Sequence, residues 1–187
     1  MIKRSPFVLL GALALLAGPT LSFTQGSAAE SREIHELRAK TERGDAVAQL
    51  ELALRYNEGV GVPVDDAEAV NWYRRAAEQG NADAQYLVAQ MYRRGEGVPN
   101  NDAEAVKWYR RAADQGDARA QSTLAFMYSD GKGVPKNHTE AHFWWSLAAA
   151  KGYDLSKFNR DIVKKRMTRE QIDETQRRLS AWKPKEE

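Results

Sequence analysis

The chain repeats itself with a period of 36 residues. Glycines mark the period, at Gly44, Gly80, Gly116 and Gly152. Between them other residues recur in fixed columns, namely Ala48, Ala84 and Ala120; Leu52, Val88 and Leu124; Ala53, Ala89 and Ala125; Tyr56, Tyr92 and Tyr128; and Trp72, Trp108 and Trp144. A fixed period of this length indicates stacked copies of one small unit, because such a unit buries its apolar face only against its neighbours.

Each unit predicts two helices joined by a loop. In the first copy, the first helix covers about residues 46–58 and places Ala48, Leu52 and Tyr56 on one face at a spacing of four. Gly59 suits the end of this helix, because glycine adopts a positive φ without steric cost.

The second helix of each unit begins with a capping-box sequence, which pairs Asp65 with Glu68, Asn101 with Glu104, and Asn137 with Glu140. Its apolar face combines alanines, which allow close helix packing, with a large aromatic residue: Ala69, Trp72 or Tyr73, Ala76 and Ala77 in the first copy. The predicted fold class is all-α, a right-handed α/α solenoid of three 36-residue helix-pair repeats at 44–79, 80–115 and 116–151, with N- and C-terminal capping helices.

The segments around the repeats predict caps. Residues 30–43 predict an N-terminal capping helix, and residues 152–187 predict C-terminal capping helices and a tail. Within the latter, we expect one helix at 155–166, then a second from the capping box of Thr168 and Gln171 to about Trp182, and a frayed tail at 183–187.

The first 29 residues have the layout of a secretory signal peptide. Lys3 and Arg4 precede an apolar run at 7–17, and small residues end at Ala29, where we expect cleavage. The run is short for a membrane span. The predicted location is therefore periplasmic or secreted, and the alternative is a chain anchored in the membrane by an uncleaved leader.

Charge and cysteine content exclude several functions. Residues 30–187 carry 26 basic and 26 acidic side chains, because the two basic residues of the leader are the only ones removed from totals of 28 and 26. This balance argues against a nucleic-acid partner. We also expect no membrane contact after signal cleavage. The chain has no cysteine, which excludes disulfides, thiolate metal sites and cysteine nucleophiles.

The repeated pattern A-x-x-x-L/V-A-x-x-Y-x-x-G-x-G-V-P-x-D/N-x-x-x-A-x-x-W-x-x-x-A-A-x-x-G resembles the Sel-one-like repeat (SLR) family, relatives of the tetratricopeptide repeats with a longer loop. The resemblance covers about 108 of the 187 residues. It implies an α/α solenoid that scaffolds protein complexes in signalling, envelope assembly or host contact, with no cofactor. The family often has glycine where Ala53, Ala89 and Ala125 stand, and its cysteine-rich members carry disulfides that this chain lacks.

Two motifs with possible chemistry have simpler explanations. His138 and His142 are four residues apart on a helix and could share a metal, but no third ligand is evident, and we expect His142 to pack and no metal to bind. Ser-x-x-Lys occurs from Ser129 and from Ser180, without the partner motifs of penicillin-binding enzymes. We therefore expect no catalytic residues and no enzyme activity. The alternative is a hydrolase of β-lactam or cell-wall type built on the same repeats.

The repeat columns also separate structural from variable positions. The strict period of the tryptophans predicts core positions rather than stacking platforms, and the Arg-Arg pairs at 74–75 and 110–111 predict solvated helix faces. The first helices of stacked pairs usually line the concave surface, so their variable residues predict a surface for a protein or peptide. The candidate partner-binding residues are Leu54, Tyr86, Gln90, Arg94 and Phe126.

The predicted function is an exported, non-enzymatic adaptor or scaffold whose concave face binds another protein or peptide in the envelope or outside the cell. A purely structural spacer is a further alternative, since some candidate residues could instead contact the next unit. The sequence favours a monomer without fixing the oligomeric state.

Overall fold

The computed structural model describes residues 32–185, and all regular secondary structure in this range is helical. The predicted signal peptide and its cleavage site after Ala29 lie outside the described residues. Residues 32–42 are helical, and the later helices are α2 (Ala46–Glu58), α3 (Asp66–Glu78), α4 (Ala82–Arg94), α5 (Asp102–Asp114), α6 (Ala118–Asp130), α7 (His138–Ala150), α8 (Asp154–Lys164) and α9 (Arg169–Ala181).

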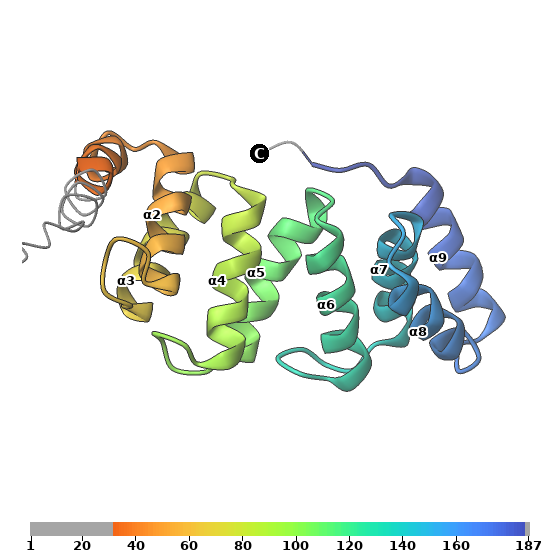
Figure 1. Ribbon diagram of the computed structural model, residues 1–187. Helices are drawn as coiled ribbons and strands as arrows, with labels where there is room; N and C mark the ends of the chain where they lie inside the picture. The colour runs from red at the N-terminus through yellow and green to blue at the C-terminus, as the bar shows by residue number, and fades with distance from the viewer. Residues whose placement is uncertain (1–31, 186–187) are drawn as a thin grey trace, which may run out of the picture.

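The helices form an elongated row of antiparallel pairs. Figure 1 shows α2, α4 and α6 in front of their partners α3, α5 and α7, with α8 and α9 at the C-terminal end. Each pair packs internally and each second helix packs on the next first helix. The all-α solenoid predicted from the period is therefore confirmed. Between residues 32 and 185, none of the helices has the length and apolar character needed to cross a bilayer.

The interior is built from alanines and deep aromatic residues. These are Tyr73 in the first unit, Tyr109 in the second and both Trp144 and Trp145 in the third, each at most 3% exposed. The preceding tryptophan column is buried at Trp108 and Trp144. Trp72 is half-buried and packs against the core from its edge, so the core prediction holds only in part for the first copy. Adjacent residues on a helix point about 100° apart, so in the first two copies the tyrosine points inward and the tryptophan lies nearer the edge.

In the second helix of each unit, only one of the two hydrogen bonds of the predicted capping box forms. Asp65 accepts a hydrogen bond from the backbone N–H of Glu68 at 2.9 Å, and the equivalent bonds form in the other two copies. The Glu68 carboxylate accepts instead from the indole N–H of Trp72, at 2.8 Å, and Glu140 accepts from Trp144 in the same way. In the first and third copies the reciprocal half of the box is thus replaced by a contact that satisfies an indole donor, whereas in the second copy Glu104 pairs with Lys107 at 2.7 Å. Both halves form at Thr168 and Gln171.

The two loop glycines of each unit have different structural roles: the first ends a helix and the second contacts the preceding unit. Gly95 and Gly131 end their helices in the left-handed conformation, as predicted for Gly59. The second glycine packs against the preceding unit: a Cβ added to Gly97 would lie 2.2 Å from the carbonyl oxygen of Asp66, and one added to Gly133 would lie 2.3 Å from that of Asp102. The loops therefore lock onto the start of the previous second helix.

The arginine pairs are less solvated than predicted, because Arg75 is exposed whereas Arg74, Arg110 and Arg111 are half-buried. Arg110 donates a 2.6 Å hydrogen bond to the hydroxyl of Tyr128 on the next unit's first helix, and Arg74 bonds Tyr92 in the same way. The second arginine of each pair stacks on the tryptophan of its own helix, with Arg111 4.9 Å from the ring centroid of Trp108. The pairs therefore help to join the units, and their loss in the third copy coincides with the end of the regular repeats.

The C-terminal helices lie close to their predicted positions, and both pack on α7. After α9 the chain returns to the end of α5. The backbone N–H of Lys185 donates to the carbonyl oxygen of Asp114 at 2.9 Å, and its ammonium pairs with the Asp114 carboxylate at 2.8 Å. The prediction of a frayed tail is therefore wrong for residues 183–185, and residues 186–187 lie outside the described range.

Candidate functional site

The two histidines of α7 do not form a metal site with other side chains. Within residues 32–185, no group of three or more His, Cys, Asp or Glu residues is placed to hold a metal ion. His142 is buried at 5% exposure, as predicted. Desolvation, reinforced by Lys164 and Arg160 of α8, lowers the pKa of its imidazole to about 4. His142 is therefore a neutral packing residue at pH 7.

In neither Ser-x-x-Lys motif is the serine hydrogen-bonded to the lysine within residues 32–185. The hydroxyl of Ser180 donates to the backbone carbonyl of Gln176 in its own helix, at 3.0 Å. Lys132 lines a surface pocket that also holds carboxylates, but Ser129 is not among the residues lining that pocket. The arrangement of serine, lysine and acid that a hydrolase of this type would use is thus not built from these motifs.

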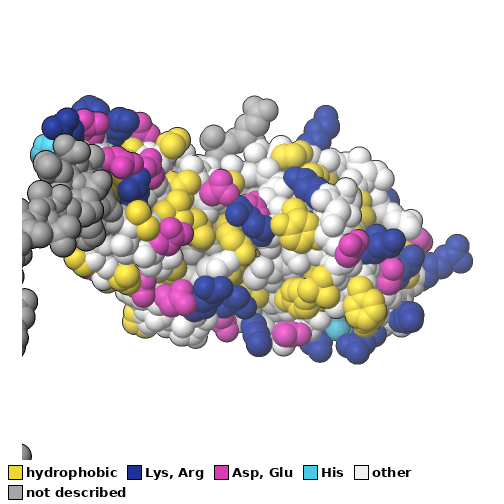
Figure 2. Space-filling view, in the orientation of Figure 1, with side chains coloured by type: hydrophobic (Ala, Val, Ile, Leu, Met, Phe, Trp, Pro, Cys, Tyr) yellow, Lys and Arg dark blue, Asp and Glu magenta, His cyan; other side chains and the backbone are white. Residues whose placement is uncertain are grey.

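The predicted partner-binding residues lie on the outer side of α2, α4 and α6, which we call the first-helix face. Figure 2 shows hydrophobic patches distributed across this face, with charged side chains between them. Arg94 is exposed, whereas Leu54, Tyr86, Gln90 and Phe126 are half-buried.

The aromatic members of this set are held by ring contacts. The Phe126 ring meets Trp145 of α7 edge-on, with centroids 5.0 Å apart. The Tyr86 ring lies 5.7 Å from that of Tyr109 on α5. Both rings are therefore fixed on one side and partly exposed on the other, which gives rigid apolar surface at low cost in conformational entropy.

Tyr86 also contacts the following unit, as the structural alternative anticipated. The guanidinium of Arg119 on α6 lies 4.5 Å from the Tyr86 ring centroid and pairs with Asp83 of α4. Hydrogen bonds from Arg119 to Asp117 and Asp83 raise the pKa of this guanidinium. The centre of the first-helix face is thus a cation–π and ion-pair bridge between two repeats.

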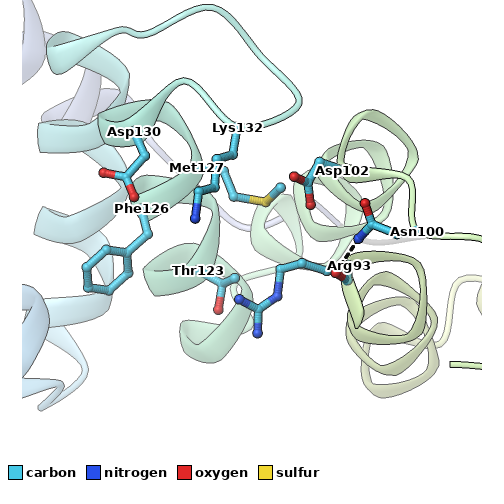
Figure 3. A pocket seen from close by; sticks show the side chains of 8 residues that line it. All are labelled: Arg93, Asn100, Asp102, Thr123, Phe126, Met127, Asp130 and Lys132. Atoms are coloured by element: carbon cyan, nitrogen blue, oxygen red, sulfur yellow. Dashed lines mark hydrogen bonds between the residues drawn. The ribbon is translucent and has the colours of Figure 1, made fainter. Parts of the chain in front are cut away.

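A pocket of about 400 Å³ opens beside Phe126 (Figure 3). One wall comes from α6 and includes Thr123, Phe126, Met127 and Asp130, and the opposite wall comes from the end of α4 and the start of α5. The complete lining is Arg93, Asn100, Asp102, Thr123, Phe126, Met127, Asp130 and Lys132.

This pocket combines a buried apolar floor with charges of both signs. Met127 is 3% exposed, while Arg93 and Lys132 supply cations and Asp102 and Asp130 supply carboxylates. Such a lining suits a peptide segment that carries one apolar side chain among polar ones. Of the five predicted partner-binding residues, Phe126 lines this pocket and the other four lie elsewhere on the first-helix face.

Sequence reasoning missed the continuation of this face onto α8. A hydrogen bond of 2.9 Å joins the hydroxyls of Ser156 and Ser122 and places α8 beside α6. Counting 36 residues onward from Ser122 and Phe126 gives Phe158 and Ile162, which are 63% and 39% exposed. The 36-residue period could have revealed this continuation. The tryptophan and alanine columns, however, do not continue into a fourth copy. The helix α9 begins five residues before the position at which the second helix of a fourth copy would begin.

The family model described as Sel1 repeat matches residues 46–81, 82–117 and 118–153. These units begin two residues later than units counted from the glycines. No curated protein matches the chain at a significant level.

Solved structures share the fold over most of the described residues. A Sel1 repeat protein from Oxalobacter formigenes superposes with a TM-score of 0.67 at 32% identity, over 76% of this chain and 58% of that one. The c5321 protein, a protective antigen present in uropathogenic Escherichia coli strains and displaying an SLR fold, gives 0.63 at 44% identity, over 66% of this chain and 26% of that one. Cysteine-rich protein B of Helicobacter pylori, at 16% identity, gives 0.54 over 67% of this chain and 93% of that one, and shows the fold alone.

The chain therefore spans 58% of the length of the first of these relatives and 26% of the second. Proteins of the matched family are generally non-catalytic repeat scaffolds that mediate protein–protein interaction. With three consecutive matches covering more than half of its length, the chain belongs to the Sel1 repeat family.

Proposed function

We propose that this protein is an exported, non-enzymatic adaptor that binds another protein through its first-helix face. The observation that carries the proposal is the pocket beside Phe126, where a buried methionine floor lies among four charged side chains. The Phe126 ring points away from the opposite wall of this pocket and is fixed by Trp145. Rigid aromatic anchors with charges around them are the usual composition of binding hot spots. Membership of a family that mediates protein–protein interaction supports the same conclusion.

Export is supported by the leader sequence, with its basic start, its apolar run and its small residues before Glu30. A second support comes from the E. coli relative, which is described as a protective antigen, since antibodies reach proteins that leave the cytoplasm. The proposed location is periplasmic or secreted, and a chain still anchored by its leader is the alternative. An N-terminus at Glu30, read by mass spectrometry of the exported protein, would distinguish the two.

Reversal of charge at the pocket should weaken partner capture. The double variant Arg93→Glu/Lys132→Glu changes two exposed side chains that line the pocket, and we expect its affinity for the partner to fall at least about tenfold. Crosslinking and pull-down with the exported protein identify the partner, and titration with that partner measures the change.

The matched control is Lys107→Glu/Arg177→Glu, which makes the same change of net charge at exposed sites on α5 and α9. The control should bind as the parent does. Equal weakening in both variants, or no enrichment of any protein relative to the pocket variant, would remove the support for a partner site at this pocket.

A further inference from the structure

Helix α8 presents an apolar stripe to solvent. Leu155, Phe158 and Ile162 are spaced by three and four residues, which places them on one side of the helix. They are 61%, 63% and 39% exposed, whereas Ser156 and Val163, on the side that faces the repeats, are buried. Three large apolar side chains are thus left uncovered on a helix of 11 residues.

Capping of the solenoid does not account for this stripe. Within the repeats, the following unit partly covers the equivalent columns, as Arg119 covers Tyr86. In the described residues after α8, α9 packs on α7 and leaves the stripe exposed. A capping element normally has a polar outer face. The stripe is the opposite of what a cap requires, so its apolar character points to a surface that covers it.

The charge around the stripe indicates the sign of that surface. Residues 154–169 contain six basic and two acidic side chains, a net of +4. Figure 2 shows Lys and Arg side chains gathered at this end of the molecule. Pairing two copies through α8 would bring these like charges together, so an anionic partner surface is favoured over a second copy. The exposed basic residues are Lys157, Lys164, Lys165, Arg166 and Arg169.

The kind of side chain on the stripe suits a lipid surface. Leu155, Phe158 and Ile162 are exposed aliphatic and aromatic side chains on a helix that also carries exposed lysines. An anionic bilayer interface offers an apolar layer for the first and phosphates for the second.

We propose that α8 docks this protein on the surface of an anionic phospholipid bilayer, with Leu155, Phe158 and Ile162 entering the headgroup region and the nearby lysines facing lipid phosphates. The helix lies on the bilayer and does not cross it. This differs from the sequence-based expectation of no membrane contact, and it is independent of the partner pocket beside Phe126. Basic amphipathic helices with aromatic and aliphatic residues on one side bind such surfaces.

The absence of cysteine allows a label at a single site. A Leu155→Cys variant, purified in its exported form and labelled with the fluorophore NBD, reports only on the surroundings of α8. With vesicles of equal parts phosphatidylcholine and phosphatidylglycerol, the emission should shift to the blue and become protected from iodide. Phosphatidylcholine vesicles alone should give no shift, and added salt should reverse it.

A label at Lys107→Cys, on an exposed position of α5, is the control for non-specific adsorption and for tethering by a retained leader. This second label should not respond. Two further variants are made in the Leu155→Cys background, and each should lower the vesicle partition coefficient at least about tenfold. One removes apolar side chains, Phe158→Ser/Ile162→Ser, and the other removes charge, Lys157→Gln/Lys164→Gln/Lys165→Gln. All these positions are exposed, so thermal melting should be little changed.

Three outcomes would overturn the proposal: a Leu155 label that ignores anionic vesicles, a label that responds equally to neutral ones, or a Lys107 label that responds as strongly. A Leu155 label that is silent with vesicles but shielded by the captured protein partner would assign the stripe to a protein interface instead. Failure of the pocket variants to affect capture would leave the vesicle result intact.

Discussion

A Gly133→Ala variant is expected to lose about 3 kcal/mol more free energy of unfolding than a Gly152→Ala variant. Both glycines adopt a positive φ, +68° and +88°, so both substitutions carry the cost of about 1–2 kcal/mol for a side chain in left-handed backbone. They differ in surroundings. A Cβ at Gly133 would lie 2.3 Å from the carbonyl oxygen of Asp102, whereas a Cβ at Gly152 would meet nothing within 4 Å.

The contact at Gly133 is with backbone, which has no rotamer to move, so the loop must detach from the start of α5. The free energy of unfolding of both variants is measured by urea denaturation, with circular dichroism as the signal. Gly97→Ala, which meets Asp66 in the same way one unit earlier, should repeat the large loss. If Gly133→Ala and Gly152→Ala proved equally stable, the loops would not lock the units together as the geometry indicates.

Acidification from pH 7 to pH 5 is expected to remove about 2 kcal/mol of stability through His142 alone. Burial lowers the pKa of its imidazole from 6.5 to about 4. Between these values the unfolded chain binds a proton at this residue and the folded chain does not. Stability is therefore fully present above pH 6.5 and falls as the pH drops toward 4.

The surroundings of His142 support this direction. Lys164 and Arg160 on α8 disfavour the imidazolium, and Asp161 only partly opposes them. His138, at the start of the same helix, shifts in the same direction and adds to the slope. Carboxylates begin to titrate near pH 5, so the interval from pH 7 to pH 5 isolates the histidine contribution best.

His142→Val is the matched control, because valine occupies the equivalent positions 70 and 106. The variant should lose clearly less stability between pH 7 and pH 5 than the parent, as measured by urea unfolding at each pH. Equal slopes in the two proteins would show that His142 does not stay neutral in the folded state.

The two proposed surfaces place different demands on the solenoid. The pocket beside Phe126 lies between repeats, so its shape depends on the packing of α4, α5 and α6. The stripe on α8 depends on a helix whose buried side rests on the last repeat. Loosening of the stack, as in Gly133→Ala, should therefore weaken partner capture more than vesicle binding.

The sequence predicted the repeat helices closely, because their signals are local. Residues 46–58 form the first helix as expected, and glycine ends it through a backbone conformation that needs no tertiary contact. The cap from Asp65 is local in the same way, since the bond spans three residues. The predicted location, the signal cleavage and the individual partner-binding residues stay predictions.

Three features depend on the packing of the helices: the deeper aromatic residue in the first two units, the contacts of the arginine pairs, and the side chains that α8 exposes. Trp72 and Tyr73 are both aromatic and adjacent, so no local pattern shows that Tyr73 lies deeper. Arg110 finds Tyr128 across a unit boundary, 18 residues away in sequence. The 36-residue period was enough to predict the unit and its stacking, because one helix pair cannot bury its apolar face alone. Contacts between units, and the exposure of Phe158 where the stack ends, depend on distances between helices that no single unit encodes.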